Sequence, residues 1–308
     1  MDVDLHFKMS SLNSIYTFIA EAANMVMLDD VTEEKMKDVS EKSEKVEVPT
    51  SKKPMQKKPI YNRKKRNCTI TPLGDNMRFF TYLSKPSFTC SNKMQMGGHE
   101  YHRNKRKYID GDKWVCLDSQ YNITPNDCLV YSFGINNEWS FDDSMDAFGC
   151  KVFAFDPTMR MNNHQRSDNI QFWNLGLSKL KGTKYIDGRK CKVDRFENIL
   201  RMLGHLDKDI DYLKMDIEGA ELEFFNDVFS RSTHVLANIK QIGMEIHPGN
   251  QVGSSAYKRF WKYFQLLECY GFHLTFSNPN SIRSNHFKYK GMPVATCYEL
   301  VWTQNKTW

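Results

Sequence analysis

The chain has 308 residues, 40% of them hydrophobic and 13% aromatic, and its formal net charge is +6. This content is enough for a real hydrophobic core in one large or two small domains. A membrane helix is excluded, because no segment reaches the roughly 18–20 uninterrupted apolar residues that one needs. The nearest stretch, residues 14–28, is interrupted by Glu21 and Asn24 and makes a poor signal peptide.

The N-terminal segment changes from acidic to basic. Residues 29–47 are mostly acidic, whereas residues 52–66 carry eight basic side chains and no acid. Such blocks bury too little apolar surface to fold, so we expect residues 1–66 to be a largely disordered tail. The basic run fits a nuclear or RNA-binding arm, a solvated tail, or a convertase cleavage site ending at Arg66. Basic residues are scattered elsewhere, which disfavours nucleic acid as the main partner.

The folded part is expected to begin with a lead-in cap over residues 67–127 and to continue as one domain over residues 128–303. In chain order the domain opens with a short apolar strand at residues 129–133 and a helix for which Ser140 can be the N-cap. Further strands are predicted at residues 151–156, 170–174, 211–216 and 239–247, with helices at 194–203, 220–229 and 257–270. Residues 272–277 and 296–303 are the last two strands.

The alternation of strands and helices predicts an α/β fold of the Rossmann-like type. Continuous apolar strands indicate a mostly parallel sheet that is covered on both faces. No helical pattern separates the last two strands, so we expect them to pair antiparallel at one edge of the sheet.

Eight cysteines are present, none in a C-x-x-C pair, so a structural zinc site has little support. If the first two strands are neighbours, Cys128 and Cys150 lie at the same end of the sheet, where a disulfide could close. Cys90 and Cys116 form a second candidate pair. The alternative is buried free thiols in a cytosolic protein. Sequons at Asn67, Asn122 and Asn305 fit N-glycosylation but are few enough to arise by chance.

A glycine and two acids follow three of the predicted strands. Gly134 ends the first strand, where its backbone can approach a ligand closely, and Asp156 ends the second. Glu138 stands where a dinucleotide-binding motif would have a later glycine, so the turn is poorly suited to bind a diphosphate. An adenosine ligand without phosphate fits better, with Asp156 accepting its two ribose hydroxyls. Asp216 ends a further strand on the same rim. The alternative for both acids is the capping of the following helix.

Two long motifs resemble one known family. The stretch "LKMDIEGAE" and the stretch from Cys128 to Thr158, with "MGG" and "WVCLD" upstream, are similar to FkbM-like methyltransferases of the methyltransferase-like protein 24 branch. The resemblance covers about residues 88–302. It implies a seven-stranded Rossmann-like sheet, S-adenosyl-L-methionine as cofactor, and methylation of a hydroxyl on a sugar, a glycan or another small molecule.

The resemblance also implies site residues. Gly134 and its neighbours would hold the methionine part of the cofactor, Asp156 the ribose, and Asp216 would lie near the transferred methyl group. The expected cofactor contacts are Ser132, Phe133, Gly134, Ile135, Asn136, Glu138, Asp156, Pro157, Asn174 and Asp216. One position departs from the family pattern, because Ser132 stands where an acid is usual. Either Glu138 replaces that carboxylate or the cofactor binds weakly.

Catalytic candidates are Asp216, Glu245 and His247, since proton removal from a hydroxyl needs a base near the acceptor. There are two alternatives. His247 is a hydrogen-bonded histidine at the rim without a catalytic role, or the three residues hold a metal ion. We predict no metal. The runner-up function is a secreted interaction protein that kept the fold and lost catalysis. A nicotinamide-dependent oxidoreductase is disfavoured by the missing glycines. The cysteines, the sequons and the resemblance favour the secretory pathway, whereas the lack of a clear signal peptide leaves the cytoplasm and nucleus open.

Overall fold

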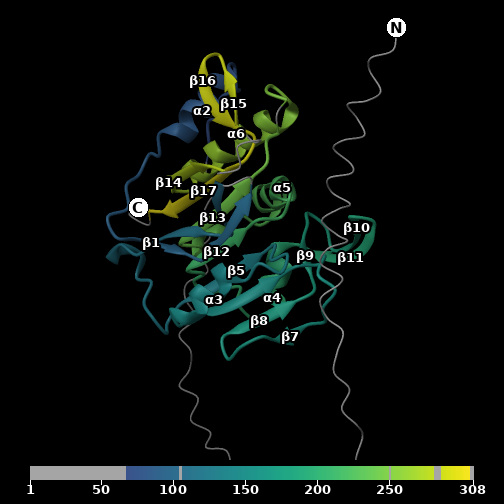
Figure 1. The fold of residues 1–308 in the computed structure, drawn as a ribbon. Helices are drawn as coiled ribbons and strands as arrows, with labels where there is room; N and C mark the ends of the chain where they lie inside the picture. The colour runs from purple at the N-terminus through teal and green to yellow at the C-terminus, as the bar shows by residue number, and fades with distance from the viewer. Residues whose placement is uncertain (1–66, 104–105, 250, 281–285, 306–308) are drawn as a thin grey trace, which may run out of the picture. The chain divides into compact units, whose positions relative to one another are not determined.

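A computed structural model describes residues 67–103, 106–249, 251–280 and 286–305, so the predicted tail at residues 1–66 lies outside the described residues. In the described part, the largest sheet has eight strands in the order β14-β17-β13-β12-β5-β6-β8-β7 (Figure 1). The strands are β5 (Leu129–Phe133), β6 (Lys151–Phe155), β7 (His164–Gln165), β8 (Ile170–Trp173), β12 (Tyr212–Met215), β13 (Gln241–Ile246), β14 (Phe272–Pro279) and β17 (Tyr298–Gln304).

The strand directions agree with the sequence prediction. Strands β8, β6, β5, β12 and β13 are parallel to one another, and β17 pairs antiparallel with both β13 and β14. A mostly parallel sheet with its last two strands antiparallel is therefore confirmed. The predicted count of seven is one too low, because the two-residue strand β7 pairs antiparallel with β8 at the other edge.

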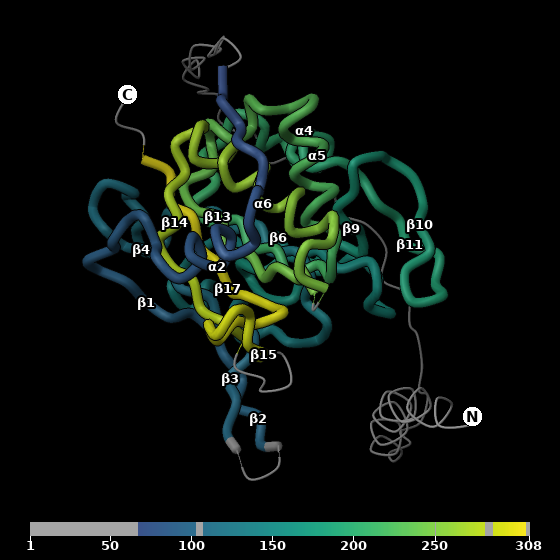
Figure 2. The backbone as a smooth tube through the Cα atoms, turned by 90° about the horizontal axis from the view of Figure 1, so that it is seen from above, coloured from purple at the N-terminus to yellow at the C-terminus, as the bar shows by residue number. Residues whose placement is uncertain are grey.

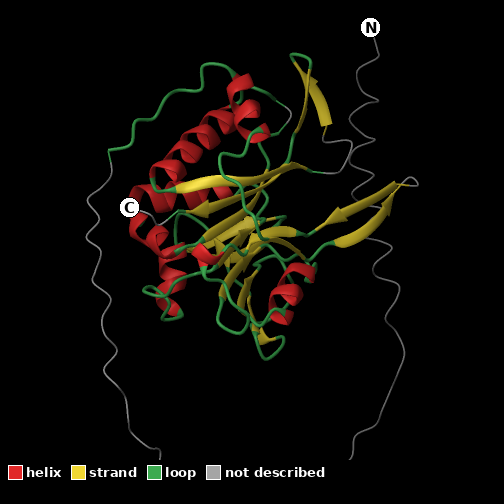
Figure 3. Cartoon of the chain, turned by 90° about the vertical axis from the view of Figure 1, so that its left-hand side faces the viewer, coloured by secondary structure: helices red, strands yellow, loops and turns green. Residues whose placement is uncertain are grey.

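Side chains that alternate along each strand build two hydrophobic clusters, one on each face of the sheet. In β5, Tyr131 and Phe133 belong to the larger cluster and Val130 to the smaller one. The larger cluster lies under four helices and the smaller under one, and Figure 3 shows most helices grouped on one side of the strands. The helices of the larger cluster are α2 (Asn76–Ser84), α4 (Phe196–Met202), α5 (Glu221–Arg231) and α6 (Ser255–Cys269), and the other is α3 (Ser140–Ala147).

The helices follow the apolar periodicity of the sequence. In α6, Tyr257, Phe260, Phe264 and Leu267 are buried and recur every three or four residues. The chain then leaves the helix at Gly271, whose φ of +83° few other residues adopt readily. The prediction for α3 needs one correction. Ser140 is its first residue and not its N-cap, and its N–H donates to Glu138 Oε1 over 3.0 Å.

The lead-in cap covers both faces of the sheet. Phe79 of α2 stacks on Phe264 of α6, with ring centroids 5.7 Å apart. On the other face, Met96 and Val115 join the smaller cluster from the antiparallel pair β1 (Lys93–Met96) and β4 (Lys113–Cys116). The cap is therefore part of the folded core.

Several small elements were not predicted from the sequence. Strands β2 and β3 form a hairpin that extends away from the sheet (Figure 2), and β15 pairs with β16 in a second hairpin. The remaining bounds are β2 (His99–Arg103), β3 (Arg106–Asp110), β9 (Gly176–Leu177), β10 (Gly182–Ile186), β11 (Arg189–Asp194), β15 (His286–Tyr289), β16 (Met292–Ala295), η1 (Ser119–Tyr121) and η2 (Thr233–Asn238).

Three disulfides hold the described chain. Cys128–Cys150 and Cys90–Cys116 confirm the two predicted pairs, with Cα atoms 4.6 and 5.8 Å apart. Cys68–Cys269 was not predicted, and it joins residues 201 positions apart. It links the start of the described chain to the last residue of α6. Among the described helices, none combines the length and the apolar character that crossing a bilayer requires.

Candidate functional site

A pocket opens at the carboxyl ends of β5, β6, β12 and β13, where strand order reverses and such sheets bind ligands. We call it the Gly134 pocket, and its volume of about 530 Å³ is that of a small-molecule site. Its lining residues are Asp110, Gly111, Phe133, Gly134, Ile135, Asn136, Glu138, Phe155, Asp156, Pro157, Thr158, Gly176, Leu177, Ile186, Asp187, Lys214, Asp216, Ile217, Glu218, Ala220 and Glu245.

The turn after β5 requires glycine at position 134. Gly134 has a φ of +81°, and a Cβ there would lie 1.6 Å from the carbonyl oxygen of Asp216. Its N–H donates to the carbonyl of Phe155 over 2.9 Å, and its own carbonyl accepts from Lys214 Nζ over 2.6 Å. The turn is thus fixed to β6 and to β12, and only a residue without a side chain fits between them.

Asp156 holds the same turn from the end of β6. Its Oδ2 accepts from the N–H groups of Ile135 and Asn136, both over 2.9 Å. Its Oδ1 accepts from the N–H and the hydroxyl of Thr158. A carboxylate has about four acceptor positions, so the protein itself supplies four donors here. The ribose contact of Asp156 stays a prediction, and it requires at least one of these donors to be exchanged.

A buried polar group lies beneath the turn, on the face that α3 covers. Asp142 of α3 is fully buried, and it lies close to Ser132 of β5 and Lys214 of β12. Burial raises the pKa of Asp142 to about 6, although the Lys214 cation and Ser132 oppose the shift. A carboxylate from α3 therefore lies beside Ser132, the position at which the resemblance leads us to expect an acid.

Acids from three adjacent strands meet at one end of the Gly134 pocket. Asp216 follows β12, Glu245 lies in β13, and Glu299 faces Glu245 across the β13–β17 pairing. Their oxygens lie within 4.8 Å of one another. The ammonium of Lys113, a buried residue of β4, lies 2.8 Å from Glu299 Oε2 and 3.6 Å from Asp216 Oδ2. Lys113 therefore places a positive charge beside two of the three carboxyls.

Because the three carboxyls lie close to one another and to Lys113, their pKa values differ. Burial and then the charge of Asp216 raise the pKa of Glu245, and burial raises that of Glu299 against the attraction of Lys113. Burial acts in the same direction on Asp216, but Lys113 and Lys214 outweigh it and hold the pKa of Asp216 below its usual value. Asp216 is then the ionised member, and Glu245 can hold a proton near neutral pH.

Glu245 has further partners that fix its position. Its Oε1 accepts from Asn280 Nδ2 over 2.9 Å and from Cys297 Sγ over 2.6 Å. Burial and then the neighbouring Glu245 raise the pKa of Cys297, which keeps it a thiol. His247 Nε2 lies 3.6 Å from both Glu245 Oε2 and Glu218 Oε2. His247 therefore touches the cluster from its outer side.

The structure brings most of the predicted site residues together and leaves three aside. Ser132 is fully buried beneath the turn, and His247 is not among the lining residues. Asn174 is outside the lining too, because its Nδ2 donates to the carbonyls of Met159 and Met161 and so holds a loop. The predicted residues that line the pocket are Phe133, Gly134, Ile135, Asn136, Glu138, Asp156, Pro157, Asp216 and Glu245.

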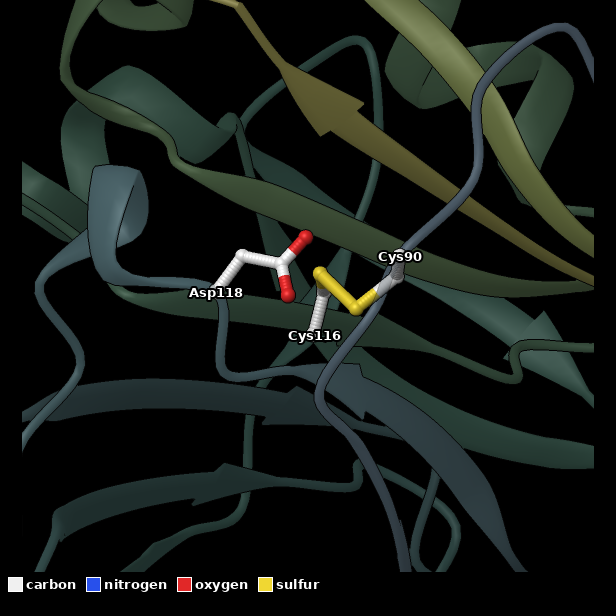
Figure 4. Close-up of side chains that lie close together, drawn as sticks. All are labelled: Cys90, Cys116 and Asp118. Atoms are coloured by element: carbon white, nitrogen blue, oxygen red, sulfur yellow. A yellow bond between two sulfur atoms is a disulfide. The ribbon is translucent and has the colours of Figure 1, made fainter.

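Two potential metal-ligand groups involve Glu245, one with His247 and Cys297 and one with Asp216 and Glu299. The set suggested by the sequence, with both Asp216 and His247, does not gather into a single group of described residues. Lys113 already supplies positive charge to the Asp216 and Glu299 carboxylates. A third group, Cys90, Cys116 and Asp118, is shown in Figure 4, where the two sulfur atoms form a disulfide and offer no thiolate.

Sequence reasoning missed Lys113, Asp142, Lys214 and Glu299. Lys214 in "YLKM" and Glu299 in "YELVW" are charged residues inside apolar stretches, whereas Lys113 and Asp142 each lie next to an acid in the sequence. Charged side chains are rarely buried unless they are paired. That pattern was the available signal, but it does not say which charges meet, since Lys113 and Glu299 are 186 positions apart.

Comparisons with known proteins agree with this geometry. A family model described as a methyltransferase domain matches residues 19–291. "Probable methyltransferase-like protein 24" of Homo sapiens is 29% identical over 248 residues, which are 74% of this chain and 64% of that protein. The Rattus norvegicus protein of the same name is 27% identical over 74% of this chain and 65% of its own. The match thus spans about two thirds of the length of these relatives.

One of the solved structures to which the chain shows some similarity is TrmK of M. capricolum in complex with S-adenosyl-homocysteine. It is 11% identical, the alignment covers 62% of this chain and 68% of that one, and the TM-score is 0.29.

Proposed function

Because the chain belongs to the methyltransferase-domain family, for which S-adenosylmethionine is the cofactor, we propose that the Gly134 pocket binds it and that the acceptor is a hydroxyl. The observation that carries the proposal is the meeting of the glycine turn and the Asp216–Glu245 pair in one pocket of about 530 Å³. The acceptor proposed is a sugar, a glycan or another small molecule with a free hydroxyl.

The lining fits the cofactor in shape and charge. The backbone of Gly134 can approach a ligand closely, and the exposed residue Asn136 lines the same pocket. Asp216 and Glu218 offer carboxylates to the ammonium and the sulfonium, while the partly exposed Pro157, Ile186 and Ile217 give apolar surface for the adenine. No phosphate has to be accommodated, which suits a rim rich in acids.

The chain's own part in the reaction is to orient the acceptor and to take its proton. When bound, the cofactor supplies a methyl group on a sulfonium, and the electron pair of the broken S–C bond stays on sulfur. The acceptor oxygen forms the new C–O bond, and Glu245 in its ionised form receives the hydroxyl proton. Asp216 raises the basicity of Glu245 by charge repulsion, and Asn280 and Cys297 hold the Glu245 carboxylate in place.

Release of S-adenosylhomocysteine with a panel of hydroxylated acceptors tests this function. We expect product only when donor and acceptor are both present, with a mass gain of one methylene on the acceptor and methylation on oxygen. Binding of S-adenosylhomocysteine without turnover on any acceptor would instead favour an interaction protein that kept the fold. A product methylated on nitrogen would contradict the hydroxyl assignment.

We further propose that the protein works in the secretory pathway, in the Golgi lumen or outside the cell. Three disulfides support this, since such bonds persist mainly in oxidising compartments. Asn122, in one of the three sequons, is exposed and therefore accessible to glycosylation. A mobility shift of the expressed protein after digestion by an N-glycosidase tests the assignment, and an unglycosylated protein with reduced cysteines in the cytosol would contradict it.

A further inference from the structure

A second, smaller cavity of about 180 Å³ lies beside the Gly134 pocket. It lies between the start of β4, the end of β14 and the start of β17, and it includes Trp114, Phe276 and Asn278. We call it the Trp114 cavity. Trp114 is the first residue of the "WVCLD" motif, whereas none of the predicted site residues lines this cavity.

The two hollows share the acid cluster as their common wall. Asp110 lines both of them. Asn280 lines the Trp114 cavity and donates to Glu245, which lines the Gly134 pocket. Lys113 and Glu299 also line the smaller cavity, and Lys113 pairs with Asp216 of the larger one. A ligand in the Trp114 cavity therefore lies next to the proposed proton acceptor.

The lining of the Trp114 cavity combines aromatic rings with hydrogen-bond acceptors and donors. Trp114 and Phe276 stack with ring centroids 5.7 Å apart and give an apolar surface. Around it are carboxylates that accept hydrogen bonds, Asp110 and Asp112, and side chains that can donate them, Asn278 among them. A hydroxyl group both donates and accepts, so a ring that carries several hydroxyls uses both kinds of partner, while its C–H faces pack on the aromatic rings.

Charged ligands fit this lining less well. A phosphate or carboxylate would meet Asp110 and Asp112. An ammonium would meet the buried ammonium of Lys113, and that of Lys93 lies 5.2 Å from the Trp114 ring centroid. Like charges at these separations repel, and the effect is larger where water is excluded. A neutral ligand meets neither penalty.

We propose that the Trp114 cavity is the acceptor subsite and that it holds a neutral polyhydroxylated ring, such as one sugar unit. The ring stacks against Trp114, and one of its hydroxyls passes Asp110 to reach Glu245 and the methyl donor. The inference rests on the proposed function, because it needs the Gly134 pocket to be the donor site.

The test is a titration of the full 308-residue chain with neutral methyl glycosides of a hexose, a pentose and an N-acetylhexosamine, followed by saturation-transfer NMR. It is done with and without saturating S-adenosylhomocysteine, and with glucose 6-phosphate and spermidine as charged comparators. We expect at least one neutral glycoside to bind and neither comparator to compete. Asn278→Ala should weaken glycoside binding about tenfold, since its side chain is exposed and the fold does not depend on it.

The matched control is Asn162→Ala, another exposed asparagine outside both hollows, which should leave glycoside binding unchanged. Trp114→Leu is a second variant and should abolish the binding while S-adenosylhomocysteine still binds. Two results would overturn this inference and leave the proposed function standing. One is saturable binding of spermidine or glucose 6-phosphate at this cavity. The other is no glycoside binding by a protein that does bind S-adenosylhomocysteine. If S-adenosylhomocysteine itself does not bind, the proposed function fails, and the glycoside titration without it still shows whether the cavity takes a sugar.

Discussion

The carbonyl oxygen of Asp216 occupies the space that a side chain at Gly134 would need, because a Cβ there would lie only 1.6 Å away. The two residues end neighbouring parallel strands, and their backbones form one side of the Gly134 pocket. The close approach ties the glycine turn, which would face the cofactor, to the strand that ends at Asp216.

Gly134→Ala should therefore abolish binding of S-adenosylhomocysteine in calorimetric titration. The added methyl group collides with backbone, which cannot move aside as a flexible side chain could. Gly204→Ala is a matched control, since Gly204 has a φ of +69° with nothing within 4 Å of the added Cβ. The control should lose only about 1 kcal/mol of stability to left-handed backbone strain and should keep binding. Equal binding by both variants would contradict the role of the turn.

Glu245→Gln should lower the rate of methyl transfer by about 10²- to 10⁴-fold while S-adenosylhomocysteine still binds, because the amide cannot accept the hydroxyl proton. Glu268→Gln is the control, since burial also raises the pKa of Glu268, which lies in α6 away from the pocket. Steady-state kinetics with one acceptor separates the two variants. A Glu245→Gln enzyme with unchanged kcat would remove Glu245 from the mechanism.

The wild-type rate should depend on pH through the same residue. Burial and Asp216 raise the pKa of Glu245, so at low pH it carries a proton and cannot accept another. The kcat should then rise with increasing pH through a pKa above the ordinary glutamate range, and level off once Glu245 is ionised. The profile of kcat against pH measures this. A rate that already levels off near pH 4.5 would show that Glu245 is not the base.

Asp142 should make the folded state less stable as the pH rises. Its pKa is about 6 when folded, against 3.8 for the ordinary side chain, because burial disfavours the charge. Below about pH 3 the carboxyl is neutral in both states and costs nothing. Between about pH 3 and 7 the unfolded chain loses its proton first, so the folded state becomes less favourable, by about 3 kcal/mol in all.

Asp142→Asn has no such titration. Its unfolding free energy, from urea denaturation, should therefore gain about 3 kcal/mol relative to the wild type between about pH 3 and 7. Asp168→Asn, at an exposed position, is the control and should follow the wild type. A constant difference between Asp142→Asn and the wild type across this range would mean that Asp142 is not held neutral by burial.

The disulfide that closes the longest loop should contribute most to stability. Cys68–Cys269 spans 201 positions, against 26 and 22 for the other two, and loop closure of the unfolded chain scales with length. Changing both Cys68 and Cys269 to Ala should lower the unfolding free energy by roughly 3–5 kcal/mol. Peptide mapping without reduction should find the three pairs, with Cys191 and Cys297 alkylated after unfolding. Another pairing would contradict the fold of the lead-in cap.

The sequence predicted the parts of this fold whose information is local. The apolar runs at residues 129–133 and 170–174 became strands β5 and β8, and the aromatic periodicity of residues 257–270 became α6. The hairpins escaped prediction because β2 and β15 have mixed polar patterns and pair only with their own neighbours. Strand β7 escaped because two residues carry no periodicity.

The site residues also divide into those that local sequence could predict and those that it could not. Gly134, Asp156 and Asp216 could be found because each directly follows a predicted strand, and the strand order then brings them to one rim. Lys113 and Asp142 could not, because their roles depend on which elements cover the sheet. The four donors on Asp156 were also invisible, since they come from the backbone of two turns.

The most direct test of the central claim is a calorimetric titration of the full chain with S-adenosylhomocysteine beside Asp156→Ala, with circular dichroism to verify that both are folded. We predict micromolar binding by the wild type and none by Asp156→Ala, because removing the carboxylate releases the turn at Ile135 and Asn136. No heat from a folded wild-type protein, or equal binding by both proteins, would contradict the assignment of the Gly134 pocket as the donor site.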